Sequence, residues 1–235
     1  MKNKNNSIID LPVMHVVHCI DTEGPMTESI LDTFKRLKNI FGIDLKPSKK
    51  NLERLQKQEI DLGGKEADVA KVVSPFLLDY KESWNAIEEM LSDCMSKKFR
   101  HKLLDDEKKG WVYSWHCMDH AGYNGNPRKK DVGFGSIYRF YKNMIRETDS
   151  HQDEINWHYH PLSFDRNPLK CSTNYFNSHD ILNEIISRRI IDENWFPTVN
   201  RPGFHTERVD IHLFLEQWIP FDYANNVYDI EDGQN

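Results

Sequence analysis

The chain has 235 residues and a net charge of −6, with 38% hydrophobic and 11% aromatic residues. This length suits one large domain that buries a substantial core. The negative charge gives no electrostatic reason to expect a nucleic-acid partner, and a neutral small molecule such as a sugar fits the composition better. No apolar run approaches the roughly 18 residues that a membrane-spanning helix needs.

Cysteine use and the N-terminal residues indicate a cytoplasmic protein. The four cysteines, at positions 19, 94, 117 and 171, form no CxxC pair and fit no zinc-knuckle spacing. A chain of this size needs no disulfide to be stable, so we expect reduced thiols. The first ten residues are polar and lack the apolar core of a signal peptide, so the sequence predicts no export through a cleaved signal.

The order of apolar patterns along the chain predicts strands that alternate with helices. Strands are expected over residues 13–20, 111–117, 154–160, 196–200 and 221–224. Helices are expected over 28–41, 136–147, 180–191 and 207–218, with Ser178 as the N-cap of the third. The stretch from 47 to 106 is expected to be helical or irregular, with one apolar helix face formed by Phe76, Leu77, Tyr80, Trp84, Ile87, Met90 and Leu91. This alternation predicts an α/β fold with a parallel sheet.

Two short segments carry metal-ligand side chains at alternate positions. Asp21 and Glu23 follow the first predicted strand, and His158 and His160 belong to the third. Side chains two apart in an extended strand point to the same face, so each pair can reach into one space. Active sites of parallel α/β folds lie at the C-terminal ends of the strands, so we expect the pairs to meet there. Carboxylates and imidazoles suit a divalent ion such as zinc, bound with an open position for water.

Each pair also has a plain structural interpretation. The carboxylates of Asp21 and Glu23 can cap the helix expected from residue 28, and the two histidines can lie on a solvated strand face. Under the metal interpretation, one carboxylate binds the ion and the other acts as a general base on water.

The ends of the other strands add further candidates. Arg201 can hold a general-base carboxylate through a bidentate pair, and Gly203 permits a close approach of the backbone. A tryptophan at the end of the second strand can stack on a sugar ring. The residues that can line a pocket or bind substrate are Trp115, His116, Asp119, His120, His205 and Asp222. The structural alternatives are a strand-ending turn with Arg201 in a structural ion pair, a core strand with a polar exit for the segment around Trp115, and a turn capped by Asp222.

Taken in order, these motifs resemble those of the polysaccharide deacetylase family, the NodB-like carbohydrate esterases. The matching segments are Asp21-Thr22-Glu23 before Gly24-Pro25, Glu154-Ile155 to His158-Tyr159-His160-Pro161, Arg201-Pro202-Gly203, and Phe214-Leu215-Glu216 to Asp222. The resemblance implies that Asp21 is the general base and that Arg201 pairs with it. It also implies a metal ion, zinc in the first place, held by Glu23, His158 and His160.

The chain departs from the family pattern in several ways. The metal-binding acid of the family is usually Asp, and Glu23 is one methylene longer. The family histidines are usually four positions apart, whereas His158 and His160 are two apart. No Leu-x-His segment follows Asp222, so the general acid has to come from another histidine, for which the candidates are His116, His120 and His205. The small number of strands indicates either a truncated chain or an open barrel.

These observations predict a single α/β domain over residues 1–235 with a helical insertion at about 26–110. The resemblance implies that this domain is a distorted (β/α)7-type barrel, incomplete here because only five strands are expected. The resemblance implies a metal-dependent hydrolase that removes an N-acetyl group from an amino sugar of a polysaccharide or glycan precursor. One alternative is a catalytically inactive, carbohydrate-binding member of the fold. The other is a hydrolase of a different C–N bond, in a formamido sugar or a cyclic amide. The sequence leaves the oligomeric state open.

Overall fold

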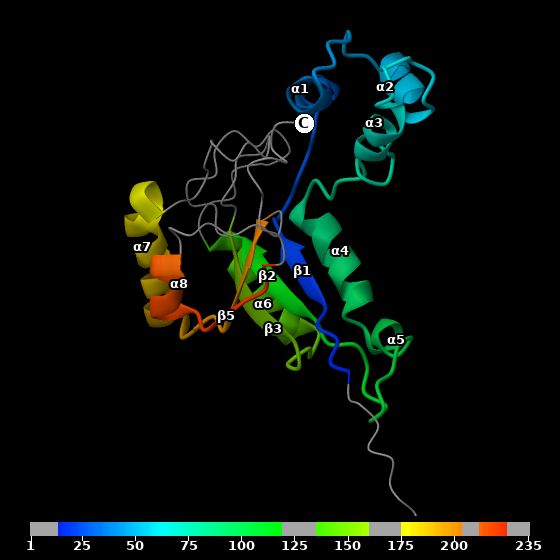
Figure 1. Cartoon of the computed structure of the whole chain (residues 1–235). Coiled ribbons are helices and arrows are strands. Elements are labelled where there is room, and N and C mark those ends of the chain that lie inside the picture. The colour runs from blue at the N-terminus through cyan, green and yellow to red at the C-terminus, as the bar shows by residue number, and fades with distance from the viewer. Residues whose placement is uncertain (1–13, 119–134, 160–174, 204–211, 225–235) are drawn as a thin grey trace, which may run out of the picture.

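The computed structural model describes residues 14–118, 135–159, 175–203 and 212–224. Five strands form one parallel sheet, namely β1 (Cys19–Thr22), β2 (Ser114–Met118), β3 (Glu154–Tyr159), β4 (Val199–Pro202) and β5 (Phe221–Asp222). The strand order in the sheet is the order in the sequence (Figure 1). The predicted α/β class with a parallel sheet is therefore confirmed.

The first strand is shorter and begins later than its apolar pattern predicts. β1 begins at Cys19, whereas Val16 and Val17 are 68% and 55% exposed. Pairing explains the difference, because β2 begins only at Ser114, which lies opposite Cys19. Within the described residues no strand lies beside the segment before Cys19, so the prediction of a buried strand over 13–20 holds as a strand for Cys19 and Ile20 and is wrong for residues 14–18.

The helices that follow β2 and β3 lie close to their predicted positions. α6 (Ser136–Glu147) matches its prediction at both ends. α7 (Tyr175–Glu193) is longer than predicted and includes Ser178, so the prediction of Ser178 as an N-cap is wrong. α8 is described over His212–Trp218. Among the described segments, no helix is both long enough and apolar enough to cross a membrane.

The range predicted as a helical insertion, residues 26–110, holds five helices and no strand. These are α1 (Ile30–Phe41), α2 (Lys49–Gln56), α3 (Glu66–Val72), α4 (Trp84–Cys94) and α5 (Lys97–Arg100). The first three share a core of their own around Leu37 and Leu55, and they lie beyond one end of the sheet (Figure 1). Within α4 the predicted apolar face holds for Ile87 and Leu91, which are buried, whereas Met90 is 40% exposed. It does not hold for Phe76, which precedes α4 and is 86% exposed.

Contacts between residues 26–36 and residues 80–81 join the two ends of the α1–α3 region close to the end of β1. The backbone N–H of Met26 donates to the carbonyl of Lys81 at 3.0 Å. Next to it, Arg36 donates to both carboxylate oxygens of Glu28, at 2.8 and 2.9 Å, and the Tyr80 hydroxyl donates to Glu28 at 3.0 Å. The Glu28 side chain is fully buried, so its charge is stable there because these donors satisfy it.

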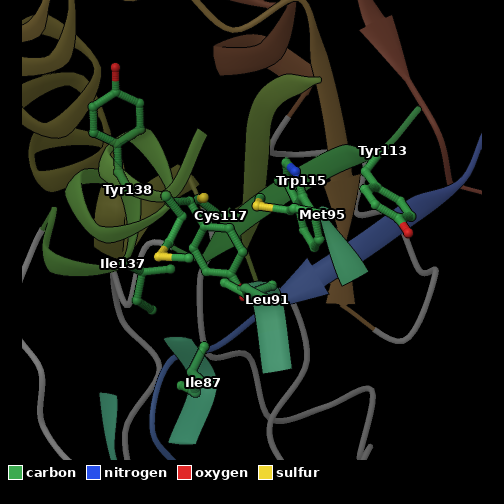
Figure 2. Close-up of a cluster of buried hydrophobic side chains, with 10 residues drawn as sticks. Ile87, Leu91, Met95, Tyr113, Trp115, Cys117, Ile137 and Tyr138 are labelled. Atoms are coloured by element: carbon green, nitrogen blue, oxygen red, sulfur yellow. The ribbon is translucent and has the colours of Figure 1, made fainter. Parts of the chain in front are cut away.

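The sheet presents an apolar face and a polar face. Trp115 and Cys117 of β2 pack with residues of α4 and α6 (Figure 2), and Trp157 and Tyr159 of β3 pack with α7 and α8. Because side chains alternate along a strand, the residues between these point to the opposite side of the sheet. We call that side the polar face, and its members are Asp21, Ser114, His116, Asn156, His158 and Arg201.

Candidate functional site

Three side chains of the polar face meet where β1, β3 and β4 end. Arg201 Nε donates to Asp21 Oδ1 at 2.9 Å, and His158 Nδ1 lies 3.7 Å from the same oxygen. Arg201 and Asp21 are therefore in contact as predicted, through an Nε–Oδ1 hydrogen bond in place of the predicted bidentate pair, and an imidazole lies beside them. The Asp21 side chain is 35% exposed, so this cluster is open to solvent on the side of the carboxylate.

The orientation of the His158 ring follows from its partner on β4. His158 Nδ1 lies 2.6 Å from the backbone carbonyl oxygen of Arg201. A carbonyl can only accept a hydrogen bond, so Nδ1 carries a hydrogen, and in the neutral ring the lone pair is therefore on Nε2. Metal-binding histidines commonly have their second ring N–H held by a carbonyl in this way. The ring is buried and its tautomer is fixed, as a ligand imidazole requires.

Glu23 lies one residue beyond β1, which ends at Thr22. The Thr22 hydroxyl donates to the carbonyl of His116 at 3.0 Å and anchors the end of the strand. Gly24 then turns the chain with φ +75°. Strand alternation therefore does not carry over from Asp21 to the half-buried Glu23, so the prediction that both carboxylates point to the same face of the strand does not hold.

The predicted metal site is only partly within the described residues. Glu23 and His158 are described, whereas His160 lies outside the described residues. Among the residues that the structure describes, no group of three His, Cys, Asp or Glu side chains is arranged to hold a metal ion. The set of Glu23, His158 and His160 remains a prediction.

His116 lies on the polar face beneath the cluster and is completely buried. Its Nδ1 donates to the carbonyl of Trp157 at 3.3 Å, and its Nε2 accepts from the hydroxyl of Ser114 at 3.2 Å. Burial lowers the pKa of His116 to about 4, although its bond to the Trp157 carbonyl favours the charged form. The ring is neutral at pH 7 and is not exposed. The predictions that His116 contacts substrate or donates a proton to it do not fit this position.

Trp115 points to the other side of β2. Its side chain is 2% exposed and lies among the apolar residues of α4 and α6, as Figure 2 shows. Its indole N–H donates to Asp153 Oδ2 at 3.0 Å, and its ring lies 4.9 Å from that of Tyr113. Trp115 is a core residue, and the prediction that it stacks on a substrate sugar is wrong.

Asp222 also lies off the polar face. Its register partner on β4 is Asn200, whose amide donates to Asp222 Oδ1 at 3.2 Å. The same oxygen accepts from the backbone N–H of Ala224 at 3.1 Å, which is the turn-capping role named as the structural alternative. Gly203 is buried and directly follows β4. Asp119, His120 and His205, the other predicted substrate-binding residues, lie outside the described residues.

Tyr223 and Asn156 belong to the site but were not among the predicted residues. The carbonyl of Tyr223 accepts from Arg201 Nη1 at 3.4 Å, and its ring centroid is 6.2 Å from that of His116. Asn156 Nδ2 donates to the Ser114 hydroxyl at 2.9 Å. Strand alternation was a signal for Asn156, which is two residues before His158. No local signal pointed to Tyr223, because its neighbour Asp222 was the residue expected at the site.

A cavity of about 190 Å³ lies elsewhere, between α6 and α7 on the apolar side of the sheet. Its lining includes Arg139 and Arg188, but these cations lie near Glu193, at 4.0 Å, and Glu184, at 2.8 Å. Nearby carboxylates therefore balance the positive charge of this cavity, which gives no reason to expect an anion there.

The arrangement on the polar face can support acid–base chemistry. A partly exposed carboxylate is held by a guanidinium, which fixes its direction, and a buried imidazole with a defined tautomer lies beside it. No family model, curated protein or solved structure matches the chain. The function is therefore inferred from the residues of the site and from the order of the motifs.

Proposed function

We propose that the protein is a metal-dependent hydrolase that removes an acyl group, acetyl in the first instance, from an amino sugar. The contact of Arg201 with Asp21, beside His158, is the observation that carries this proposal. The three residues come from motifs far apart in the sequence, and the resemblance to the polysaccharide deacetylases assigns them to one active site. The proposal includes a sugar as the substrate and the cytoplasm as the location of the protein.

Strand order supports a barrel related to that family. Doubly wound sheets reverse their strand order at a switch point and carry helices on both faces. Here the strands follow one another in sequence order, and α6, α7 and α8 pack on the same side of the sheet. A sheet whose described helices α4, α6, α7 and α8 pack on one side, with polar groups at the C-terminal ends of its strands on the other, fits an incomplete (β/α)-type barrel.

The proposed ligands of the metal ion are Glu23, His158 and His160. Zinc suits this mixture of carboxylate and imidazole donors. The Nδ1–H of His158 is held by the Arg201 carbonyl, as the second ring N–H of a metal-binding histidine commonly is. When bound, the ion would polarise the amide carbonyl and lower the pKa of water.

Proton transfer in this proposal depends on Asp21. Its carboxylate takes a proton from the attacking water while the new C–O bond forms, and Arg201 holds the carboxylate in the required direction. The C–N bond then breaks, and the amine leaves with a proton. Of the three histidines considered as its donor, His116 is buried and neutral, which leaves His120 and His205.

Metal analysis tests the proposal directly. Native protein should hold about one divalent ion per chain, as a single catalytic site requires. His158→Ala should lose it, whereas His151→Ala, at a histidine whose side chain is 69% exposed, should keep it. Unchanged metal content in the His158→Ala variant would remove the site.

Activity is tested on a panel of N-acetylated and N-formylated sugars, by measuring released acetate and formate. Asp21→Asn should keep the metal and lower kcat by about 10²- to 10⁴-fold, the range expected for loss of a general base. Release of formate alone would favour the alternative C–N hydrolase. Binding of the sugars without release by the metal-loaded native protein would favour the carbohydrate-binding alternative.

A further inference from the structure

Two histidines of the polar face make the same kind of hydrogen bond on successive strands. His116 of β2 donates through Nδ1 to the carbonyl of Trp157 on β3, at 3.3 Å. His158 of β3 donates through Nδ1 to the carbonyl of Arg201 on β4, at 2.6 Å. The acceptor of the first bond is the peptide that directly precedes His158. The two bonds therefore follow one another across the sheet, the first from β2 to β3 and the second from β3 to β4.

A layer of buried polar side chains supports the first step. Ser114 donates its hydroxyl hydrogen to His116 Nε2 and accepts from Asn156 Nδ2. Asn156 Oδ1 in turn accepts from the hydroxyl of Thr198, at 3.3 Å, and from the backbone N–H of Val199, at 3.2 Å. Each donor in this chain has an acceptor, so His116 has one tautomer and one orientation.

The cost of burying this layer indicates that it has a specific use. Ser114, His116 and Asn156 are 8%, 0% and 1% exposed, and burying polar groups is unfavourable unless they are hydrogen-bonded. Apolar side chains of similar volume would fill the space without that requirement. Satisfied polar networks differ from apolar packing because they define the positions of particular atoms. Here the atoms that they define belong to the backbone of β3 at His158.

We propose that His116 is a positioning residue, which holds the Trp157 peptide and thereby keeps the His158 ring on the Arg201 carbonyl. This inference rests on the proposed function in one respect, that His158 serves as a metal ligand. The hydrogen-bond geometry that it concerns does not depend on any reaction, so the two can be tested separately.

The test uses three substitutions of His116 and reads out the ring hydrogen of His158. His116→Asn places an amide N–H near the position of Nδ1 and keeps a donor for the Trp157 carbonyl. His116→Gln reaches toward Ser114 and leaves that carbonyl without the donor. His116→Leu removes both bonds. Leu91→Ala, in the core on the apolar side of the sheet, controls for a general loss of stability.

The measurement is NMR of the metal-free full chain with ¹⁵N-labelled histidine. The Nδ1–H signal of His158 is identified by its absence in a His158→Gln variant. Its hydrogen exchange should become about five- to tenfold faster in His116→Gln and His116→Leu, the factor that loss of one neutral hydrogen bond gives. It should stay within about twofold of native protein in His116→Asn and Leu91→Ala.

An unchanged exchange rate in His116→Gln would overturn the inference, as would equal acceleration in His116→Asn and His116→Gln. The Gln variant retains a partner for Ser114, so it carries the test if the Leu variant does not fold. A native protein that binds no metal and releases no acetate would contradict the proposed function and leave this measurement standing.

Discussion

Arg201 and Asp21 lie 180 positions apart in the chain, yet Arg201 Nε donates to Asp21 Oδ1 at 2.9 Å. The backbone carbonyl of the same arginine accepts from His158 Nδ1. Residue 201 therefore orients the carboxylate through its side chain and the imidazole through its main chain. Only the first of these contacts depends on which amino acid occupies the position.

Arg201→Lys should separate these two contacts. Lysine keeps the charge but lacks the planar guanidinium that directs Asp21, while the backbone bond to His158 remains. We expect kcat to fall by about 10- to 100-fold, as for a misdirected catalytic group. The free energy of unfolding should change by less than about 1 kcal/mol because the pair is partly exposed. Urea unfolding, metal content and acyl release measure the three effects. A loss of metal as well would show that the side chain, and not only the backbone, supports His158.

Arg100 of α5 and Asp153 form a buried ion pair that ties the helical region to the sheet. Arg100 donates to the two oxygens of Asp153 at 2.8 and 2.6 Å. Asp153 also accepts from the Tyr113 backbone and the Trp115 indole. Both charged side chains are almost completely buried, at 4% and 0% exposure.

Removing one partner should leave the other charge buried. Arg100→Met should therefore lower the free energy of unfolding by about 3–5 kcal/mol, measured in urea. The double variant Arg100→Met/Asp153→Leu should recover part of this loss, since no charge is left buried. Lys38→Ala, in the exposed pair with Asp44, should leave the unfolding midpoint unchanged. A similarly small effect of Arg100→Met would mean that the pair contributes little.

The meeting of Asp21, His158 and Arg201 was predictable from the sequence because it depends on one general property. Parallel strands end at the same edge of a sheet, so residues that close successive strands come together. The ends of α6 were predictable as well, since its apolar periodicity spans Ser136–Glu147. The start of β1 was not, because it depends on where β2 begins to pair and not on its own residues.

Trp115 and His116 show a second limit on what the sequence alone predicts about the site. Adjacent residues of a strand point to opposite faces, so the two could not both line one pocket. Which of them faces the site depends on which side of the sheet the helices cover. The residues of β2 alone do not show which of the two faces the site. In the sheet Asp21 pairs with His116, so His116 lies on the polar face together with Asp21 and His158. Strand register is a tertiary property, so a local pattern does not contain it.

The pH dependence of stability should report on His116. Burial lowers its pKa to about 4 in the folded protein, compared with 6.5 as the ordinary value. Asp21, His158 and Arg201 are the charged or titratable groups that act on it. Between pH 6.5 and 4 the unfolded chain takes up a proton that the folded protein does not. Stability therefore falls as the pH decreases through this window.

The expected loss from this one group is about 3 kcal/mol between pH 7 and pH 4. Carboxylates also titrate in this range, so the comparison has to be made between native protein and His116→Gln. Urea unfolding at several pH values should show that the free energy of unfolding falls by about 3 kcal/mol less between pH 7 and pH 4 in the variant than in native protein. Parallel pH profiles for the two proteins would show that the His116 ring is not protonated differently in the folded and unfolded chains.

Gly24 and Gly42 offer a matched pair of substitutions, because both have positive φ, +75° and +73°. A Cβ on Gly42 would meet nothing within 4 Å, whereas on Gly24 it would lie 3.2 Å from Ile137 Cγ1 and 3.3 Å from Trp84 Cη2. Gly42→Ala should cost about 1 kcal/mol from the left-handed backbone alone. Gly24→Ala should cost about 1–3 kcal/mol more, because the surrounding side chains have to shift.

Gly24 also follows Glu23 directly, so displacement of its backbone should disturb the proposed ligand. Metal content is expected to fall in Gly24→Ala and to stay at the native level in Gly42→Ala, and urea unfolding of both variants gives the stabilities. Equal losses of stability would mean that Ile137 and Trp84 can move aside without cost. Full metal content in a destabilised Gly24→Ala protein would instead separate Glu23 from the ion, and His158 and His160 would then need another acidic partner.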